Sequence, residues 1–300
     1  MNISFTLPDN ADEIPAKKFL RQNGVSVHLW RRIKHNGVST VNGSPVILAL
    51  TMLHAGDTLT CTLDETSPIE PIEMTLDIRY EDDYLLIVNK PTPLLVHPVS
   101  HKKPEPTLAN GVTYYYEKTH QNLIFHPMHR LDRNTSGLVL IAKAPHMQSQ
   151  LTGKDGALFH RRYIGIASGI VTPPDGIIDA PIARKPGSII EQEVNRAEGK
   201  PAVTRYRTMA TLGDETLLDI APVTGRTHQI RVHLASIGHP LIGDDLYGEQ
   251  SNKINRQALH AYRIDLIHPV TKERLTVTAP LPEDMKQYIK EKSPELKLEF

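Results

Sequence analysis

The sequence predicts an α+β fold whose main domain is built on an antiparallel or mixed sheet. Short stretches with strand composition, apolar or alternating with polar residues, recur along most of the chain. Many of them are separated by turn signals such as Asn42-Gly43 and Gly213-Asp214, which join neighbouring strands as hairpins. Helical spacing is limited to a few stretches. Many hairpin-linked strands interrupted by few helices are typical of the α+β class.

Length and composition are those of an ordinary globular protein. The chain has 300 residues, enough for one large or two ordinary domains. Its apolar content of 39% and charged content of 23% argue against a disordered or fibrous protein. Because 34 basic residues balance 34 acidic ones, overall charge provides no argument for a nucleic-acid partner. Such an argument must come from the distribution of charge along the chain.

The single cysteine and the N-terminus indicate the compartment. Cys61 lies in an alternating strand pattern and cannot form an internal disulfide, so we expect a small core residue in a reducing compartment. The start of the chain has no basic segment leading into an apolar one, and no apolar run approaches the roughly 20 residues of a membrane span. We therefore expect a cytoplasmic protein without a membrane partner.

Residues 1–63 are predicted to form a small domain with a basic face. Helical spacing covers Ala16–Gln22 and His28–Lys34, and strand patterns follow at Val38–Val41 and Thr58–Leu63. Between residues 14 and 56 the chain has no acidic residue but carries Lys17, Lys18, Arg21, Arg31, Arg32 and Lys34. Basic side chains gathered in this way neutralise phosphates and make binding salt-dependent. A merely solvated helical face is the alternative interpretation.

Residues 64–74 are acidic, contain Pro68 and Pro71, and are predicted to be an extended linker to a second domain at 75–300. Thr107 is a plausible cap for the first helix of that domain. The predicted elements, in order, are strands at 84–89 and 94–98, a helix at 107–118, a helix at 145–152, a strand at 161–167, a long exposed hairpin or loop at 184–200, paired strands at 202–212 and 216–222, closing strands at 259–267 and 275–279, and a charged helix from Pro282.

The stretch around which the second domain is organised runs from His129 to Gly137, and a buried strand pattern follows it. One carboxylate, Asp132, stands between Arg130 and Arg133. An opposite charge nearby lowers the pKa of a carboxyl group, so we expect Asp132 to be ionised and suited to act as a nucleophile or base. An ion network that closes a turn would have the same local sequence, and structural networks also perturb pKa values.

Two further positions carry candidate functional side chains. The sequence after Gly225 predicts a strand-to-helix corner that presents Arg226, with Thr227 as helix cap and with Ile230, Leu234 and Ile237 on one face. By itself Arg226 suits a phosphate contact or a structural role equally. A strand tyrosine such as Tyr163 is by itself most simply a packing residue.

Four histidines raise the question of a metal site. His97, His101, His126 and His129 lie in the first part of the second domain. They show no close cysteine or histidine pairing at the spacing of metal ligands. We therefore expect no metal.

The stretch from His129 to Gly137 resembles the signature of RluA-type pseudouridine synthases, His-Arg-Leu-Asp-x-x-Thr-Ser-Gly. Two more stretches resemble the same family in the same order. The first is Asn-Lys-Pro at 89–91 with Leu-Val-His-Pro at 95–98, where Pro93 replaces the usual glycine. The second is Gly-Arg-Thr-His-Gln-Ile-Arg at 225–231, continued to residue 248, where Asp245 replaces a common proline. The resemblance covers about residues 78 to 280.

The resemblance implies a curved sheet that carries a catalytic cleft, an N-terminal module similar to the alpha-L RNA-binding domain, and a reaction without cofactor. It assigns catalysis to Asp132, Tyr163 and Arg226, with Arg226 paired to Asp132 and Tyr163 beside the uracil. By the same resemblance Arg130 contacts RNA and helps to fill the space of an extruded base, and Ile230 packs under the uracil. The full RNA-binding set comprises Arg130, Arg133, Ile230, Arg231, Lys17, Lys18, Arg21, Arg31, Arg32 and Lys34.

These features predict an RNA pseudouridine synthase that acts as a monomer without an obligate protein partner. Large-subunit ribosomal RNA is the expected substrate, because the N-terminal module is typical of the ribosomal enzymes, and transfer RNA is the alternative. A non-catalytic RNA-binding ribosome-assembly factor is a second alternative, since the basic segment at 14–56 suits it equally. A glycoside hydrolase is disfavoured because it needs a second carboxyl group, and the signature stretches contain none.

Overall fold

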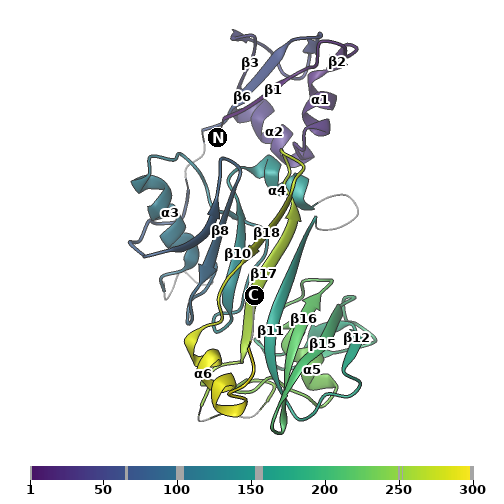
Figure 1. The fold of residues 1–300 in the computed structure, drawn as a ribbon. Helices are drawn as coiled ribbons and strands as arrows, with labels where there is room; N and C mark the ends of the chain where they lie inside the picture. Colours follow the sequence, from purple (N-terminus) through teal and green to yellow (C-terminus); the bar gives the residue numbers. More distant parts are fainter. Residues whose placement is uncertain are drawn as a thin grey trace.

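The computed structural model describes residues 2–64, 67–98, 105–152, 158–248, 251 and 253–297. A small N-terminal region lies at one end of a long sheet that forms the body of the molecule (Figure 1). The α+β class is confirmed. His101, one of the four histidines considered as metal ligands, lies outside the described residues.

The N-terminal region is a four-stranded sheet with strand order β1-β6-β3-β4, packed against two helices. Asn42 and Gly43 both have positive φ angles, as the turn between β3 and β4 requires. Ser26 begins α2 by accepting a hydrogen bond from the Leu29 amide. The elements are β1 (Asn2–Thr6), β2 (Ile14–Pro15), α1 (Ala16–Gln22), α2 (Val27–Asn36), β3 (Val38–Val41), β4 (Ser44–Pro45), β5 (Met52–Leu53) and β6 (Thr58–Thr62).

This region has its own apolar core, which includes Phe19, Leu20, Ile33 and the buried Cys61. The described residues between β6 and β7 (Asp77–Glu81) form no helix or strand. The core of the N-terminal region is therefore separate from the cores that line the long sheet.

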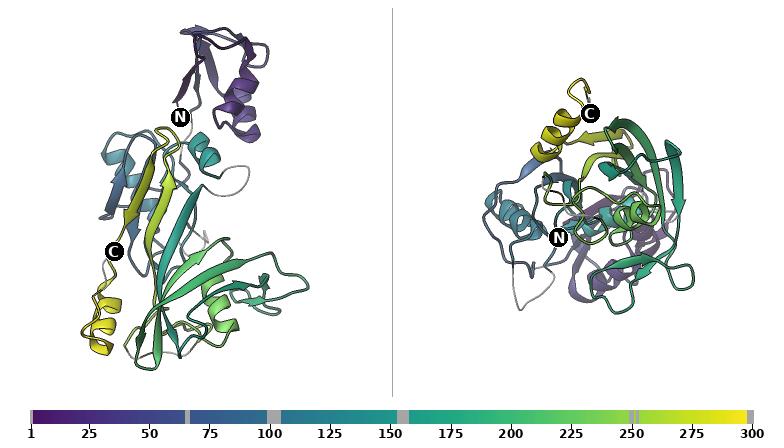
Figure 2. Two further views of the ribbon diagram at one scale, coloured as in Figure 1. Left: turned by 45° about the vertical axis from the view of Figure 1, so that its right-hand side comes forward. Right: turned by 90° about the horizontal axis from the view of Figure 1, so that it is seen from below.

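The long sheet has ten strands, with the path β12-β15-β16-β11-β17-β10-β8-β7 and with β18 and β9 at its sides. Only the pair β10 and β17 is parallel among the named pairs, so the sheet is mixed. Its two halves bend away from each other (Figure 2). The strands after β7 are β8 (Leu85–Lys90), β9 (His126–Pro127), β10 (Ser136–Ala142), β11 (Phe159–Ser168), β12 (Asp175–Asp179), β15 (Val203–Leu212), β16 (Glu215–Pro222), β17 (Leu259–Ile267) and β18 (Arg274–Thr278). A separate small hairpin pairs β13 (Ile182–Arg184) with β14 (Gln192–Val194).

Alternate residues of the central strands point to opposite faces of the sheet. One face packs against α3 (Leu108–Lys118) and α5 (Gln229–Ser236), and its core includes Val139 and Tyr163. The opposite face packs against α4 (Pro145–Thr152) and α6 (Glu283–Lys292), and its cores include Leu138 and Ile164. Because both faces are covered, every residue of β10 is buried, which explains its continuous apolar sequence.

Most of the predicted elements form within a residue or two of their expected bounds, but the strand predicted at 94–98 does not. Backbone groups of this segment form hydrogen bonds with two other segments. The Leu94 amide donates to the Arg133 carbonyl, and the carbonyls of Leu95 and Val96 accept from the first turn of α3. Only an isolated bridge joins Leu95 to Thr107. This segment therefore connects the helix to the loop before β10 instead of extending a sheet.

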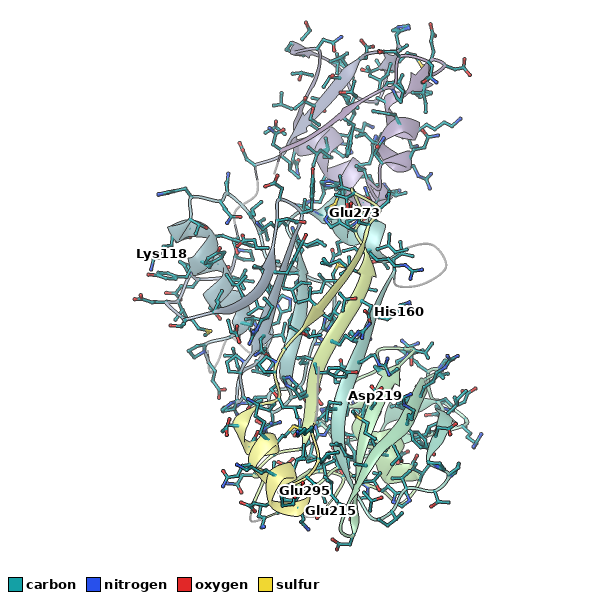
Figure 3. The ribbon with its side chains drawn as sticks, in the orientation of Figure 1. Lys118, His160, Glu215, Asp219, Glu273 and Glu295 are labelled. Atoms are coloured by element: carbon teal, nitrogen blue, oxygen red, sulfur yellow. The ribbon has the colours of Figure 1, made fainter. Side chains whose placement is uncertain are left out.

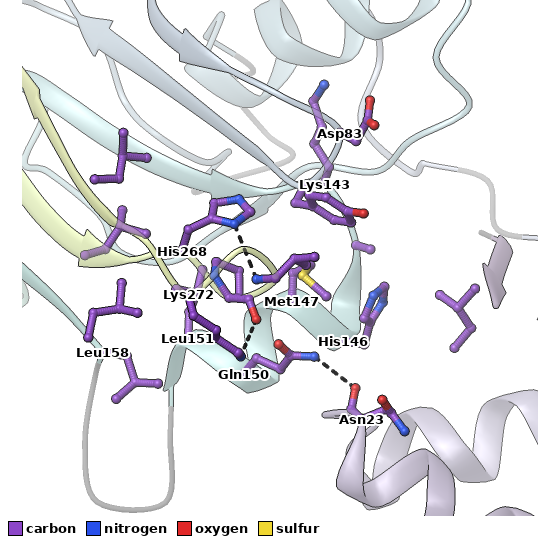
Figure 4. A pocket seen from close by; sticks show the side chains of 18 of the residues that line it. Asn23, Asp83, Lys143, His146, Met147, Gln150, Leu151, Leu158, His268 and Lys272 are labelled. Carbon is purple, nitrogen blue, oxygen red and sulfur yellow. Dashed lines mark hydrogen bonds between the residues drawn. The ribbon is translucent and has the colours of Figure 1, made fainter. Parts of the chain in front are cut away.

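A cavity of about 1340 Å³ lies where the N-terminal region meets the long sheet. There the side chain of Gln150 on α4 donates to the Asn23 carbonyl at 3.0 Å (Figure 4). The ring of His146 lies edge-on to that of Phe5. The residues that line this cavity include none of the predicted catalytic residues. No helix in the described ranges is long and apolar enough to cross a membrane.

Candidate active site

The loop that carries Asp132 connects β9 to β10 and is held by hydrogen bonds to residues beyond it. The Thr135 amide donates to the Asp132 carbonyl at 3.1 Å and closes a turn. The Thr135 hydroxyl accepts from the side chain of Gln257 at 3.0 Å, and the Ser136 hydroxyl lies 2.9 Å from Nδ1 of His260. These buried partners position the backbone on the C-terminal side of Asp132.

A buried lysine holds the same loop from β8. The Lys90 ammonium donates to the carbonyls of Pro91, Leu94 and Arg133 at 3.0, 2.7 and 3.3 Å. Burial lowers the pKa of Lys90 to about 7, although the negative charge of Asp132 opposes that change. All three protons of the ammonium group therefore have a backbone acceptor next to the Asp132 turn.

Gly137 explains why the loop sequence ends in glycine. Its φ angle is +117°, and a β-carbon at this position would lie 2.3 Å from the Ala261 carbonyl oxygen on β17. Only glycine allows this close approach of the two parallel strands.

The ion-pair partner of Asp132 is Arg231 on α5. Arg231 Nη1 lies 3.4 Å from Asp132 Oδ2, while Nε and Nη2 each donate to the Asp244 carboxylate at 2.7 Å. The side chains of Arg231 and Asp244 are 4% and 0% exposed, whereas that of Asp132 is 28% exposed. Burial alone would lower the pKa of Arg231, but the bonds to Asp244 outweigh it and raise that pKa. The site thus combines a buried, fixed cation with an accessible carboxylate.

His228 is the second charged or polar neighbour of Asp132. Its Nε2 lies 4.0 Å from Asp132 Oδ1, and its Nδ1 lies 2.8 Å from the Tyr247 hydroxyl. Burial lowers the pKa of His228, and the nearby carboxylate of Asp132 opposes this.

Tyr163 lies on β11 in the apolar cluster that also contains Ile230. Its side chain is buried, and this burial is the main cause of its raised pKa. The negative charge of Asp132 raises the pKa further, whereas a hydrogen bond from Arg161 lowers it. Asp132, Tyr163 and the adjacent pair Ile230 and Arg231 therefore come from three segments that are distant in sequence but meet at one end of the parallel strand pair.

Comparisons with known proteins place this site in a family. The family model for RNA pseudouridylate synthase matches residues 84–236, which contain the Asp132 loop, β11 and α5. An uncharacterized RNA pseudouridine synthase of Bacillus subtilis, YjbO, is 39% identical over 281 residues, which are 91% of this chain and 98% of that protein. The chain belongs to the RNA pseudouridylate synthase family.

Other members of the family share most of the chain. Ribosomal large subunit pseudouridine synthase D of Escherichia coli is 38% identical, covering 76% of this chain and 73% of that protein. The solved structure of human RNA pseudouridylate synthase domain containing 1 has a TM-score of 0.55 and 26% identity, covering 71% of this chain and 86% of that chain. The expected family and enzyme class are confirmed.

Three arginines that the sequence assigned to Asp132 lie elsewhere. Arg226 is exposed, and its Nε donates to the Pro201 carbonyl at 3.0 Å. Arg133 pairs with Glu105 at 3.1 Å, and Arg130 is exposed. Among the described residues, only the basic side chains of Arg231 and His228 lie within 4.0 Å of the Asp132 carboxylate. The predicted pairing of Arg226 with Asp132 is therefore wrong, because the first turn of α5 directs Arg231, not Arg226, toward the carboxylate.

Three further expectations about this stretch are also wrong. The predicted RNA contact by Arg231 conflicts with its burial and with its bonds to Asp244. Thr227 does not cap α5, because His228 is the N-cap residue and has a left-handed backbone. Ile237, expected on one helix face with Ile230 and Leu234, lies just beyond the end of α5 and is 39% exposed.

Several residues that build the site were not predicted from the sequence. Asp244 and His228 lie within the stretch that resembles the family, but their side chains had no partner that could be read from sequence. Arg256 lies outside every quoted motif. It binds Asp284 of α6 through two bonds and donates to the Asn134 carbonyl at 3.3 Å, so it joins α6 to the Asp132 loop. The sequence feature that could have identified Asp244 is its place in the same matched stretch as Arg231, since a buried arginine requires a carboxylate.

Proposed function

We propose that this enzyme converts specific uridines of large-subunit ribosomal RNA to pseudouridine in the cytoplasm, as a monomer, with Asp132 as the reacting carboxylate. The observation that carries the proposal is the accessible Asp132 carboxylate next to Arg231, whose side chain is almost completely buried. A purely structural ion pair has no need of this exposure. The names of the ribosomal relatives support the choice of RNA.

The reaction breaks the bond from ribose carbon 1′ to nitrogen 1, turns the uracil, and rejoins it through carbon 5. Asp132 acts either by attacking the sugar or by removing a ribose proton. Arg231 orients the carboxylate, and Asp244 prevents Arg231 from moving toward the substrate. This fixed electrostatic arrangement costs no reorganisation when charge develops during the reaction.

We propose that Tyr163 takes part in removing the proton from carbon 5 of the uracil. Burial raises its pKa, so its hydroxyl is protonated at neutral pH. The hydroxyl therefore accepts the carbon 5 proton only as it passes on its own, which makes it one member of a proton relay. Ile230, in the same cluster, provides an apolar surface under the uracil.

Access to the target base requires that the nucleotide leave its stack. Extruding a base costs a few kcal/mol, and the cost is smallest in loops and weak pairs. The exposed Arg130 precedes Asp132 by two residues, and we propose that it occupies part of the space left by the base. Structured RNA loops are accordingly the proposed substrates.

The N-terminal region is proposed to hold RNA through its phosphates. Lys17, Lys18, Arg21, Arg31 and Lys34 are exposed on α1 and α2, and Arg32 is partly buried. Lys17 and Lys34 lie 4.9 and 5.5 Å from the ring centre of Trp30, so that one aromatic side chain brings cations of the two helices together. Replacing Lys17 and Lys18 by alanine should lower RNA affinity and reduce its salt dependence, as measured by filter binding at several salt concentrations.

The deciding experiment maps pseudouridine in total RNA from cells that lack the gene and carry either the wild type or Asp132→Asn. We expect one or a few pseudouridines of large-subunit RNA to return only with the wild type. Asp265→Asn is the matched control, because Asp265 is also an arginine-paired carboxylate, 29% exposed, but lies on β17 away from the loop. It should restore the modification.

The same map separates the alternatives. If the lost pseudouridines lie in transfer RNA, the substrate proposal is wrong and the catalytic proposal stands. If Asp132→Asn restores every lost modification, Asp132 is not the reacting group and the catalytic proposal is refuted.

A further inference from the structure

We propose that His228 is a positioning residue for Asp132, held by the Tyr247 hydroxyl in the neutral form whose Nε2–H faces the carboxylate. This inference rests on the proposed role of Asp132. Its basis is a chain of polar contacts that runs from β14 through Tyr247 and His228 to Asp132.

The donors and acceptors along the chain assign the proton. The backbone amide of Gln192 can only donate, and it does so to the Tyr247 oxygen at 2.7 Å. The Tyr247 hydroxyl then donates its hydrogen to His228 Nδ1, which lies 2.8 Å away. A neutral imidazole that accepts at Nδ1 carries its proton on Nε2, the atom 4.0 Å from Asp132 Oδ1. Catalytic hydrogen bonds are often long without substrate and shorten when it binds.

The backbone of His228 indicates that this orientation is imposed. Its φ and ψ angles of 54° and 18° are left-handed, a backbone conformation that residues other than glycine adopt with strain. This conformation starts α5 and directs the ring between Tyr247 and Asp132, where the ring is 12% exposed. Glycine would start the helix with less strain, so the side chain itself is what the position gains.

The chain also connects the site to the small hairpin. Gln192 is the first residue of β14, and the loop between β13 and β14 exposes Ile189 and Ile190. A displacement of this hairpin would remove the donor that fixes the Tyr247 hydroxyl. The position of the hairpin is thereby coupled to the orientation of the His228 ring.

The charged groups around His228 affect how readily its ring binds a proton, and a protonated ring would change the contacts of Asp132 and Tyr247. The carboxylates of Asp132, Asp244 and Asp245 favour its charged form, whereas Arg231 and burial disfavour it. A protonated ring would donate from Nδ1 as well, so it would lose the bond from the Tyr247 hydroxyl. It would also place a second positive charge beside Asp132 and reduce the reactivity of the carboxylate.

The first test is His228→Gly, measured by single-turnover kinetics on a uridine-containing RNA that the wild type modifies. We expect the rate constant to fall about tenfold, which corresponds to about 1.4 kcal/mol, with unchanged RNA affinity and unchanged or higher thermal stability. Partial recovery by His228→Asn, which tolerates the left-handed backbone and keeps a donor, would support the orientation argument. An unchanged rate in His228→Gly would refute it.

Tyr247→Phe is the second test, because it keeps the ring that packs on Arg231 and removes only the hydroxyl. Without the donated hydrogen bond, His228 binds a proton more easily, so the acid limb of the rate profile should move to higher pH by about one unit. The control Tyr288→Phe removes a hydroxyl that binds Glu215 near α6 and should leave the profile unchanged. Identical profiles for Tyr247→Phe and the wild type would overturn the assignment.

Asp132→Asn separates the two proposals. If it is inactive while both His228→Gly and Tyr247→Phe behave as the wild type, only the inference about His228 fails. If Asp132→Asn retains activity, the role of Asp132 fails, and the positioning role of His228 fails with it.

Discussion

Two groups of paired aspartate and arginine side chains, one on the long sheet and one beside it, have opposite exposure. Asp219 lies on β16 (Figure 3). It is 4% exposed and is bound by Arg162 and Arg207, which are 35% and 69% exposed. Asp132 is 28% exposed and faces Arg231, which is 4% exposed. One pair hides its carboxylate behind solvated cations, and the other hides its cation and presents the carboxylate.

The difference follows from what holds each arginine. Arg162 has Asp219 as its carboxylate partner, so this pair satisfies itself within regular strands. Arg231 has a second and better partner in the buried Asp244, which leaves Asp132 with a longer contact and free oxygen lone pairs. The carboxylate of an ion pair is therefore a candidate catalytic group when its cationic partner is already bound to a second carboxylate.

The comparison predicts its largest effect for the two aspartates themselves. Asp132→Asn should lower the single-turnover rate by about a thousandfold or more while the free energy of unfolding stays nearly unchanged. Asp219→Asn should do the reverse, because it removes charge-assisted hydrogen bonds from a buried group, at a cost of about 1.5–3 kcal/mol. Urea denaturation and kinetics of both variants provide the test. Comparable loss of stability in both would contradict the distinction.

The two arginines should differ in the next largest effect. Arg231→Met leaves Asp244 buried without its partner, so we expect a loss of about 3–5 kcal/mol in the free energy of unfolding together with loss of activity. Arg162→Met should cost less, because Arg207 remains near Asp219. Denaturation monitored by circular dichroism measures both. A smaller loss for Arg231→Met than for Arg162→Met would contradict the role of Asp244.

A third, smaller effect concerns pH, because the Asp132 loop rests on a histidine. Burial lowers the pKa of His260 to about 4, below its ordinary value of 6.5. The unfolded chain then binds more protons than the folded one between these values, so stability should fall as the pH drops from about 6.5 toward 4. His260→Gln should flatten part of this slope in urea titrations. Equal slopes in the wild type and His260→Gln would contradict this.

The smallest effect is expected for Arg226→Met. Arg226 is exposed and bonds to a backbone carbonyl, so its loss should change the free energy of unfolding by no more than about 0.5 kcal/mol. We expect the rate constant with saturating RNA to remain close to that of the wild type, while RNA affinity weakens a few-fold through loss of one cation. A collapse of the rate constant at saturation would restore Arg226 to the catalytic group.

Local patterns predicted most of the secondary structure for identifiable reasons. Continuous apolar residues at 138–142 predicted a buried strand, and the structure covers β10 on both faces. The Asn42-Gly43 turn and the cap at Thr107 are set by neighbours in sequence. The segment at 94–98 looked like a strand but serves as a connector, since its partners Arg133 and α3 are distant in sequence.

The sequence by itself determined the family, the fold class and the position of the Asp132 loop, because a nine-residue signature and hairpin spacing are local features. Only the tertiary structure decided which arginine faces Asp132. Arg226 and Arg231 are five residues apart in one stretch, and no local rule separates them. The packing of α5 against the sheet and the burial of Asp244 do so, because a buried guanidinium must lie where carboxylates can satisfy it.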